Sequence, residues 1–172
     1  MRIACVVVLA IAVACRASPH LARQQNRLDF AAVDSIVLER GPCLGGACPV
    51  YRLSIASHGR VQFQSGVPQD QPTATDSIAS GSFRDLVRTA KRISFATLPS
   101  FTPDNREVCG YALTDFPSVR TSVFAADRAV VVDDYRACHG PTDQPDIAQR
   151  LQALRRFEDA IDSVARAGRW VR

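Results

Sequence analysis

The chain has 172 residues, of which 47% are hydrophobic and 22% are charged, an ordinary mix for one globular domain with flanking segments. Its net charge of +4 comes from arginines scattered along the chain, with Lys91 as the one lysine. The sequence therefore lacks the concentrated basic face that nucleic-acid binding needs, and we expect no nucleic-acid partner.

The first residues, MRIACVVVLAIAVAC, have the pattern of an export signal. Arg2 precedes a stretch of twelve apolar residues from Ile3 to Ala14. This stretch is too short to cross a hydrocarbon core of ~30 Å comfortably, and it suits a signal peptide. It ends in small residues directly before Cys15, as in a bacterial lipobox, although Ala12 stands where the lipobox usually has leucine. The same residues fit the A-x-A rule of ordinary signal peptidase, so a freely secreted protein is the alternative.

The cysteine count favours lipidation of Cys15. Removal of residues 1–14 takes one of the six cysteines away and leaves five, an odd number that is unusual in an exported protein. A lipid on Cys15 leaves an even set of four. We expect residues 1–14 to be a signal peptide, residues 15–32 a flexible tether and residues 33–172 a single domain. We expect the protein in the cell envelope or periplasm, with the membrane as a partner through a lipid anchor on Cys15.

The first part of the domain predicts strands. Residues 34–40 are rich in β-branched side chains and predict a first strand. Alternating apolar and polar residues then predict an antiparallel hairpin from residues 51–56 and 60–64. A three-residue loop centred on His58 puts the apolar residues of this hairpin opposite one another and gives Gly59 the left-handed position that suits it. These apolar residues are Leu53, Ile55, Val61 and Phe63.

A first helix is predicted after a polar loop over residues 66–81. Ser82 is the candidate N-cap, the helix begins at Phe83, and its end is expected at residues 93–96. A long irregular connection over residues 97–115 follows.

A second hairpin is predicted after Pro117, with its turn at Ala126 and Asp127. Val119, Thr121 and Val123 alternate with polar residues in its first strand. The run of three valines at residues 130–132 predicts that its second strand is covered on both faces.

The last helix has apolar residues every three or four positions over five turns, with Asp146 at its start and Gly168 closing it. These apolar residues are Ile147, Leu151, Leu154, Phe157, Ile161 and Val164. The order β-β-β-α-β-β-α predicts an α+β fold, with an antiparallel sheet of about five strands and two helices packed on one of its faces.

The segment CLGGACPVY, residues 43–51, is the one stretch that looks like a chemical site. A zinc site would need a second short knuckle to complete four ligands, and Cys138-His139 is not one. A redox site would favour C-x-x-C at the start of a helix, whereas Cys48 precedes a proline and a strand. The oxidising surroundings of an exported protein favour a disulfide between Cys43 and Cys48, with zinc and redox chemistry as the alternatives.

Cys109 and Cys138 remain, and the second hairpin favours their pairing. The hairpin returns Cys138 to about the level of residue 115, and Cys109 lies in an irregular segment that can reach back. Hydrolase and nucleotide-binding signatures such as G-x-S-x-G, H-E-x-x-H and the Walker loop are absent from the sequence. We expect no catalytic residues, no cofactor and no metal ion.

The run from Ile36 to Gly66 resembles the start of an uncharacterised bacterial domain of unknown function that is common in exported proteins and lipoproteins. The resemblance continues through the first helix to Trp170. This chain has one residue more between its first two domain cysteines than the family pattern. The pattern centres on that pair, which implies a local bond, and it implies no activity or catalytic residues. Its hallmark residues here are Arg40, Cys43, Gly45 or Gly46, Cys48, Pro49, Tyr51 and Gly59.

These observations predict a non-enzymatic domain of the cell envelope with a binding or structural role and an unidentified protein or ligand as its partner. One alternative is a thiol–disulfide redox protein that uses Cys43 and Cys48. A further alternative is an inhibitor or immunity-type protein.

Overall fold

The computed structural model describes most of the chain, namely residues 28–46, 48–66 and 73–171. The expected signal peptide, the lipidation candidate Cys15 and most of the expected tether lie outside these residues. Leu28 is buried and Phe30 packs against the core, so packing in the structure begins before residue 33. Within the described part, no helix combines the length and the apolar character needed to cross a membrane.

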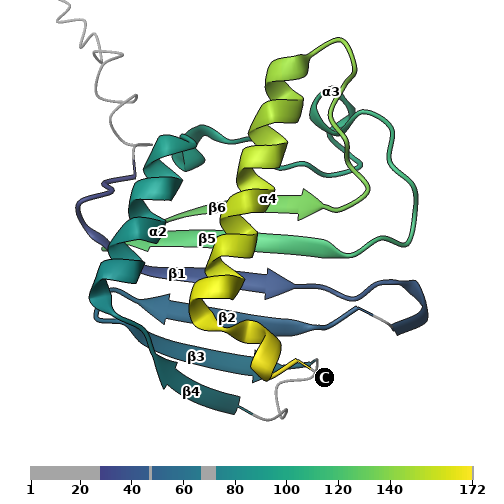
Figure 1. The fold of residues 1–172 in the computed structure, drawn as a ribbon. Helices are drawn as coiled ribbons and strands as arrows, with labels where there is room; N and C mark the ends of the chain where they lie inside the picture. The colour runs from purple at the N-terminus through teal and green to yellow at the C-terminus, as the bar shows by residue number, and fades with distance from the viewer. Residues whose placement is uncertain (1–27, 47, 67–72, 172) are drawn as a thin grey trace, which may run out of the picture.

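Six antiparallel strands form one sheet in the spatial order β4-β3-β2-β1-β5-β6 (Figure 1). They are β1 (Val33–Arg40), β2 (Tyr51–Ala56), β3 (Arg60–Ser65), β4 (Thr73–Ser77), β5 (Ser118–Ala125) and β6 (Arg128–Tyr135). The α+β class and the antiparallel sheet are confirmed. The expected five strands and the order β-β-β-α-β-β-α are wrong in detail, because β4 lies in the segment predicted as a polar loop and precedes the first long helix.

β4 was not predicted from the sequence because it is a polar strand at the edge of the sheet. Its sequence, TATDS, has no large apolar residue, and it pairs with β3 alone. Ala74 and Asp76 are half-buried, and the other three residues are exposed. Backbone hydrogen bonds to β3 rather than side-chain burial hold this strand, so hydrophobic periodicity carries no signal for it.

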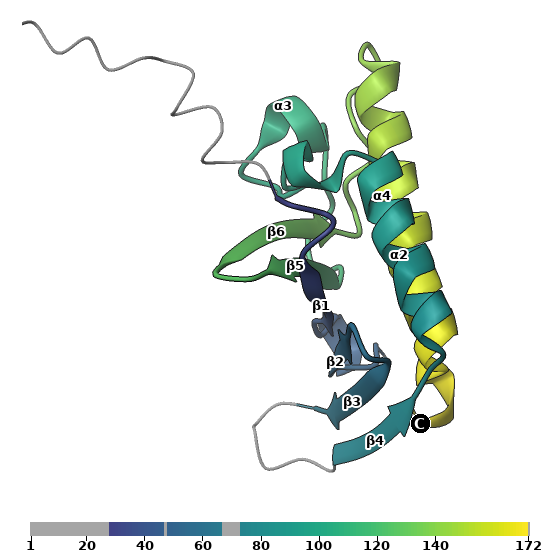
Figure 2. The same cartoon turned by 90° about the vertical axis from the view of Figure 1, so that its left-hand side faces the viewer.

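Two long helices, α2 (Ser80–Arg92) and α4 (Pro145–Ala165), lie side by side on one face of the sheet, as predicted (Figure 2). α2 begins before the predicted cap Ser82, with Ala79 in the cap position. α4 ends at Ala165, and the residue that closes it is Arg166, whose φ of 54° is left-handed, rather than Gly168. Four short helical segments complete the fold: η1 (Leu44–Gly46), η2 (Phe95–Thr97), α3 (Arg106–Cys109) and η3 (Ala167–Arg169).

The predicted register of the first hairpin is confirmed. Ile55 pairs with Val61 and Leu53 pairs with Phe63, and all four side chains are buried under the helices. Gly59 has φ +89°, and a Cβ at this position would lie 2.2 Å from the carbonyl oxygen of Ile78. The turn therefore needs glycine both for its backbone conformation and for the close approach of the next segment.

The second hairpin turns at Ala126 and Asp127 as predicted, since Ala125 pairs with Arg128. The expectation that β6 is covered on both faces is wrong. Val132 is buried, but Val131 is 46% exposed. In the described part of the chain, helices cover one face of the sheet, so alternate residues of β6 point to the open face.

The end of the chain folds back onto the sheet at Trp170. The ring centroid of Trp170 lies 4.9 Å from that of Phe63, which in turn lies 5.2 Å from that of Tyr51. Arg169 lies over the Trp170 ring and forms an ion pair with Asp76 of β4. These contacts hold the end of α4 and η3 against β2, β3 and β4.

Candidate functional site

The structure brings the four domain cysteines together in two pairs. The Sγ atoms of Cys43 and Cys48 lie 2.02 Å apart, and those of Cys109 and Cys138 lie 1.99 Å apart. The Cys43–Cys48 loop connects β1 to β2, and this connection is tied to the start of β5. The N–H of Gly41 donates to the carbonyl oxygen of Ser118 at 2.7 Å. The loop is thereby fixed at this end of the sheet.

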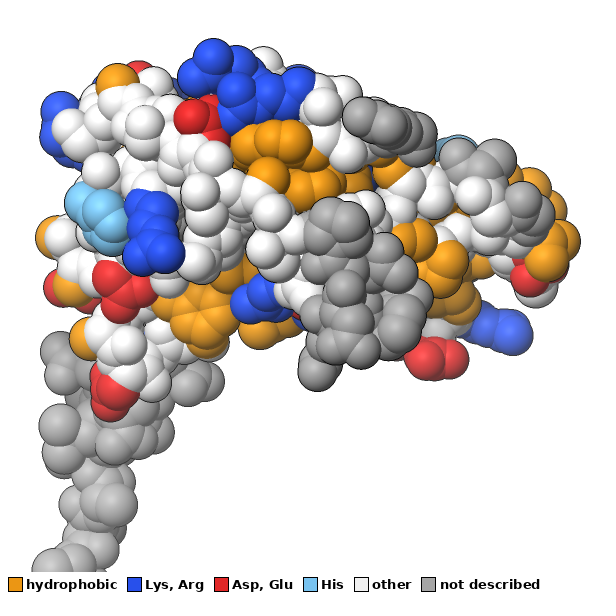
Figure 3. All heavy atoms as spheres, turned by 90° about the horizontal axis from the view of Figure 1, so that it is seen from below, with side chains coloured by type: hydrophobic (Ala, Val, Ile, Leu, Met, Phe, Trp, Pro, Cys, Tyr) orange, Lys and Arg blue, Asp and Glu red, His pale blue; other side chains and the backbone are white. Residues whose placement is uncertain are grey.

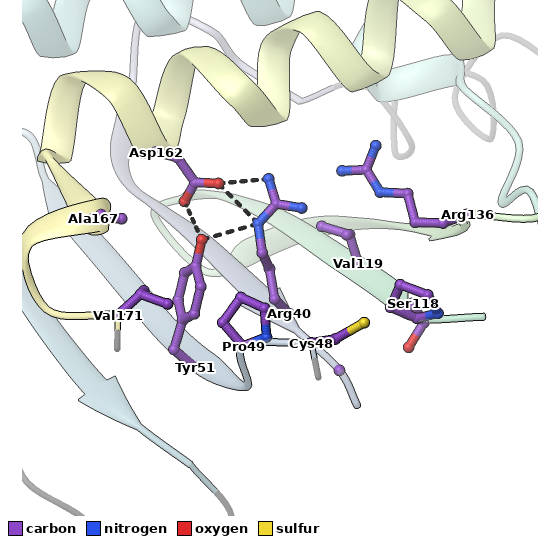
Figure 4. A pocket seen from close by; sticks show the side chains of 13 residues that line it. Arg40, Cys48, Pro49, Tyr51, Ser118, Val119, Arg136, Asp162, Ala167 and Val171 are labelled. Atoms are coloured by element: carbon purple, nitrogen blue, oxygen red, sulfur yellow. Dashed lines mark hydrogen bonds and ion pairs between the residues drawn. The ribbon is translucent and has the colours of Figure 1, made fainter. Parts of the chain in front are cut away.

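Arg40, Tyr51 and Asp162 form a polar cluster beside this loop (Figure 4). Arg40 ends β1 and Tyr51 begins β2, and the two residues are directly opposite in the register. Asp162 comes from the last turns of α4. Arg40 Nε donates to Tyr51 Oη at 2.9 Å and to Asp162 Oδ2 at 2.8 Å, and the Tyr51 hydroxyl donates to Asp162 Oδ1 at 2.7 Å. The cluster ties α4 to two neighbouring strands.

Burial and mutual contact set the protonation states of this cluster. Burial raises the pKa of Tyr51 far above its usual value, and the hydrogen bond to Asp162 and its negative charge raise it further. Burial alone would lower the pKa of Arg40, but the Asp162 carboxylate and the Tyr51 hydroxyl more than offset this effect and raise it. Tyr51 therefore stays a neutral donor and Arg40 stays a cation over the physiological range.

A second, more deeply buried network lies next to the first. Asp134 on β6 and Glu158 on α4 have no exposed surface. Arg155 donates to both carboxylate oxygens of Asp134 at 2.9 Å. Arg136 donates to Glu158 Oε2 at 2.8 Å and lies 3.4 Å from Asp134, and Thr121 donates to Glu158 Oε1 at 3.2 Å. Each buried carboxyl group thus has an arginine as its hydrogen-bond partner.

Burial raises the pKa of Glu158 to about 8. The positive charge of Arg136 opposes this shift, and the negative charge of Asp134 adds to it. The folded pKa lies above the unfolded value of about 4.5, so the native state holds an extra proton between these two values. The stabilising contribution of the protonated group is complete below about pH 4.5 and is lost as the pH rises through about 8.

The variant Glu158→Gln is therefore expected to flatten the pH dependence of stability. Between about pH 5 and about pH 8 the wild-type protein should lose at least about 1 kcal/mol of unfolding free energy, and the variant should lose less, because glutamine does not titrate. Urea denaturation at both pH values measures this difference. Parallel profiles for the two proteins would mean that Glu158 does not titrate in this range.

A pocket with a volume of about 390 Å³ opens at the end of the sheet, between the Cys43–Cys48 loop, the start of β5 and the end of α4 (Figure 4). Arg40, Tyr51, Asp162 and Arg136 contribute its polar groups, and Cys48 lies in its wall. Seen from below, hydrophobic side chains gather in patches between polar and charged ones (Figure 3). The apolar part of the pocket wall consists of Pro49, Pro117, Val119, Ala167 and Val171.

The sequence named some of these residues without assigning them to a site. Arg40, Tyr51 and Asp162 belong to the resemblance pattern without a role assigned to them, and Arg136 and Glu158 were not singled out at all. The available signal was a charged residue at a position where periodicity demands an apolar one, as at Glu158 next to Phe157. Among the described residues, no three His, Cys, Asp or Glu side chains lie together as a metal site would need.

A family model with the description "Domain of unknown function (DUF6438)" matches residues 34–156. The matched segment includes Arg40, the Cys43–Cys48 loop, Tyr51 and Arg136, and it ends before Asp162. No curated protein matches this sequence.

Proposed function

Because this chain belongs to the DUF6438 family, a domain of unknown function whose description supplies no activity, we propose its function from the site itself. The domain is a non-catalytic binding module of the bacterial cell envelope, and its pocket beside the Cys43–Cys48 loop holds a ligand. The pattern of an export signal in residues 1–14 and the small residues before Cys15 support this place. Fatty-acid labelling of the wild-type chain in cells, with none on a Cys15→Ala variant, tests that place.

The observation that carries this proposal is the preformed pocket. Its volume of about 390 Å³ lies within the range of ~300–1,000 Å³ that is common for small-molecule sites. An apolar wall with a few convergent polar groups is the usual composition of such sites. The disulfide loop and the cluster of Arg40, Tyr51 and Asp162 fix its walls, so a ligand would find a rigid site and little ordering cost.

The state of the polar groups favours binding over catalysis. Arg40, Tyr51 and Asp162 hold one another in hydrogen bonds, and the raised pKa of Tyr51 makes it a poor acid and keeps it from ionising to a phenolate base. The sulfur of Cys48 is bonded to Cys43 rather than present as a thiolate. A thiol–disulfide role would need this loop to open, whereas a binding role uses it as it stands.

Mapping of small fragments by NMR tests the proposal. Backbone amide shifts on addition of apolar fragments should concentrate at Gly41, Ser118, Gly168 and Val171, which line the pocket. The variant Gly168→Phe should reduce these shifts, because a Cβ at this position meets no atom within 4 Å and the added ring can occupy the pocket without disturbing the core.

Gly81→Phe is the matched control. Gly81 lies on α2, outside the pocket lining, and a Cβ there meets one atom, Arg84 Nη2, at 3.9 Å. This variant should bind fragments as the wild type does. Shifts that are spread over the surface, or that concentrate on the open face of the sheet, would contradict a ligand site at the end of the sheet.

A further inference from the structure

We propose that the pocket recognises a small molecule or chain end that carries a carboxylate on an apolar body, with the carboxylate held between Arg40 and Arg136. This inference deepens the proposed function and rests on it. It adds the chemical class of the ligand and the two residues that bind its charged group.

Two guanidinium groups meet at this pocket from different strands. Arg40 ends β1 and Arg136 directly follows β6, with β5 between these strands in the sheet. Both side chains are 18% exposed and both line the pocket. Figure 4 shows the two guanidinium groups directed toward one another above Val119. A planar carboxylate between them would receive charge-assisted hydrogen bonds from both sides.

Each of the two arginines has one nitrogen whose N–H groups are available to a ligand. Arg40 uses Nε and Nη2 for Tyr51, Asp162 and Asp159. Arg136 uses Nη1 and Nη2 for Asp134 and Glu158. Within the described part of the chain, Arg40 Nη1 and Arg136 Nε donate to no protein atom. A bound carboxylate can take these donors without breaking the contacts that hold the fold.

The compensating carboxylates lie mainly on the far side of the two arginines. Asp134 and Glu158 are buried between β6 and α4, and neither lines the pocket. Asp162 is the one acidic residue in the pocket lining, and both of its oxygens are already engaged by Arg40 and Tyr51. The pocket side of the arginine pair is therefore open to an incoming anion.

The apolar part of the pocket wall determines the chemistry of the rest of the ligand. Pro49, Pro117, Val119, Ala167 and Val171 offer no charge, and burial of an aliphatic chain against them is favourable. The volume of about 390 Å³ restricts the ligand to a short chain. Two sources supply this chemistry, namely a free fatty acid and the carboxyl terminus of an apolar peptide.

Calorimetric titration of the full chain with matched probes tests the inference. Octanoate is compared with octan-1-ol, and N-acetyl-Val-Leu with a free carboxylate is compared with its amide. At least one acid should bind about tenfold or more tightly than its uncharged analogue. This ratio of affinities corresponds to the free energy of one charge-assisted hydrogen bond. The acid that binds identifies the source. In wild-type protein, octanoate or the acid peptide should also shift the Nε–H resonances of Arg40 and Arg136.

Two variants distinguish the effect of the Arg136 charge on binding from an effect on folding. Arg136→Gln with Glu158→Gln replaces both partners of a buried contact, a change that buried pairs often tolerate, and it should abolish the preference for the acid. Glu158→Gln alone keeps Arg136 and should keep the preference. A double variant that is folded by circular dichroism and still prefers the acid overturns the role of Arg136. If it does not fold, the arginine resonances of the wild type decide the same point.

The remaining outcomes distinguish this inference from the proposed function. If the acids and their uncharged analogues bind in the pocket with equal affinity, carboxylate recognition is overturned and the pocket remains a binding site for neutral ligands. Fragment shifts at the pocket without binding of any of the four probes overturn this ligand class alone. Absence of both fragment shifts and probe binding overturns the proposed function as well.

Discussion

The variant Arg155→Met is expected to lower the free energy of unfolding by about 3 kcal/mol or more. Asp134 has no exposed surface, and Arg155 contacts both of its oxygens at 2.9 Å. Removal of the guanidinium leaves Asp134 with Arg136 at 3.4 Å as its remaining cation. It also removes the donor to the carbonyl oxygens of Tyr135, Arg136 and Cys138. Urea denaturation monitored by circular dichroism measures the loss.

Arg156→Met is the matched control for this prediction. Arg156 is the next residue in the sequence, but its side chain is exposed on the outer side of α4. Exposed substitutions away from specific contacts usually change stability by less than about 0.5 kcal/mol. Equal losses for the two variants would contradict the role assigned to the Arg155–Asp134 contact.

Replacement of both Cys109 and Cys138 by alanine is expected to cost about 3–4 kcal/mol. The bridge joins residues 29 positions apart and encloses the whole β5–β6 hairpin. Its removal increases the conformational freedom of the unfolded chain over this long segment. Alanine is chosen because both cysteines are fully buried. For a domain of this size the melting temperature should fall by about 10 °C, which differential scanning calorimetry measures.

The second bridge provides the comparison. Cys43 and Cys48 are 5 positions apart, so their double alanine variant should lose about 2 kcal/mol, less than the variant of the long bridge. The order of the two losses follows from loop length. A larger loss for the short bridge would mean that native packing around the Cys43–Cys48 loop, and not chain entropy, dominates its contribution.

The elements that could be predicted from the sequence are those whose burial is periodic. The register of the first hairpin followed from Leu53, Ile55 and their partners, because a slip by one residue would turn the whole apolar set to the solvent. The last helix followed in the same way from its apolar stripe. β4 could not be predicted, because a polar edge strand leaves no periodic trace. The exposure of Val131 depends on which face of the sheet the helices leave open.

The sequence carries one sign of the site, namely charged residues at strand positions that face the core. Arg40 follows Ile36 and Leu38 on the helix-facing side of β1, and Asp134 follows Val132 on β6. A charge at a core-facing position predicts a buried partner. The partners could not be identified, because Arg40 and Asp162 are 122 residues apart in the chain and meet only through the packing of α4 on the sheet.

A crystal structure of the domain with its best-binding fragment tests the central claim, a ligand site at the end of the sheet, most directly. The expected result is a ligand inside the pocket, in contact with Val119 and Val171 and with any carboxylate between Arg40 and Arg136. The Arg40–Asp162 contacts at 2.5–2.8 Å should be unchanged, since the pocket is preformed. A fragment bound elsewhere on the surface, or a pocket closed by inward movement of η3, would contradict the claim.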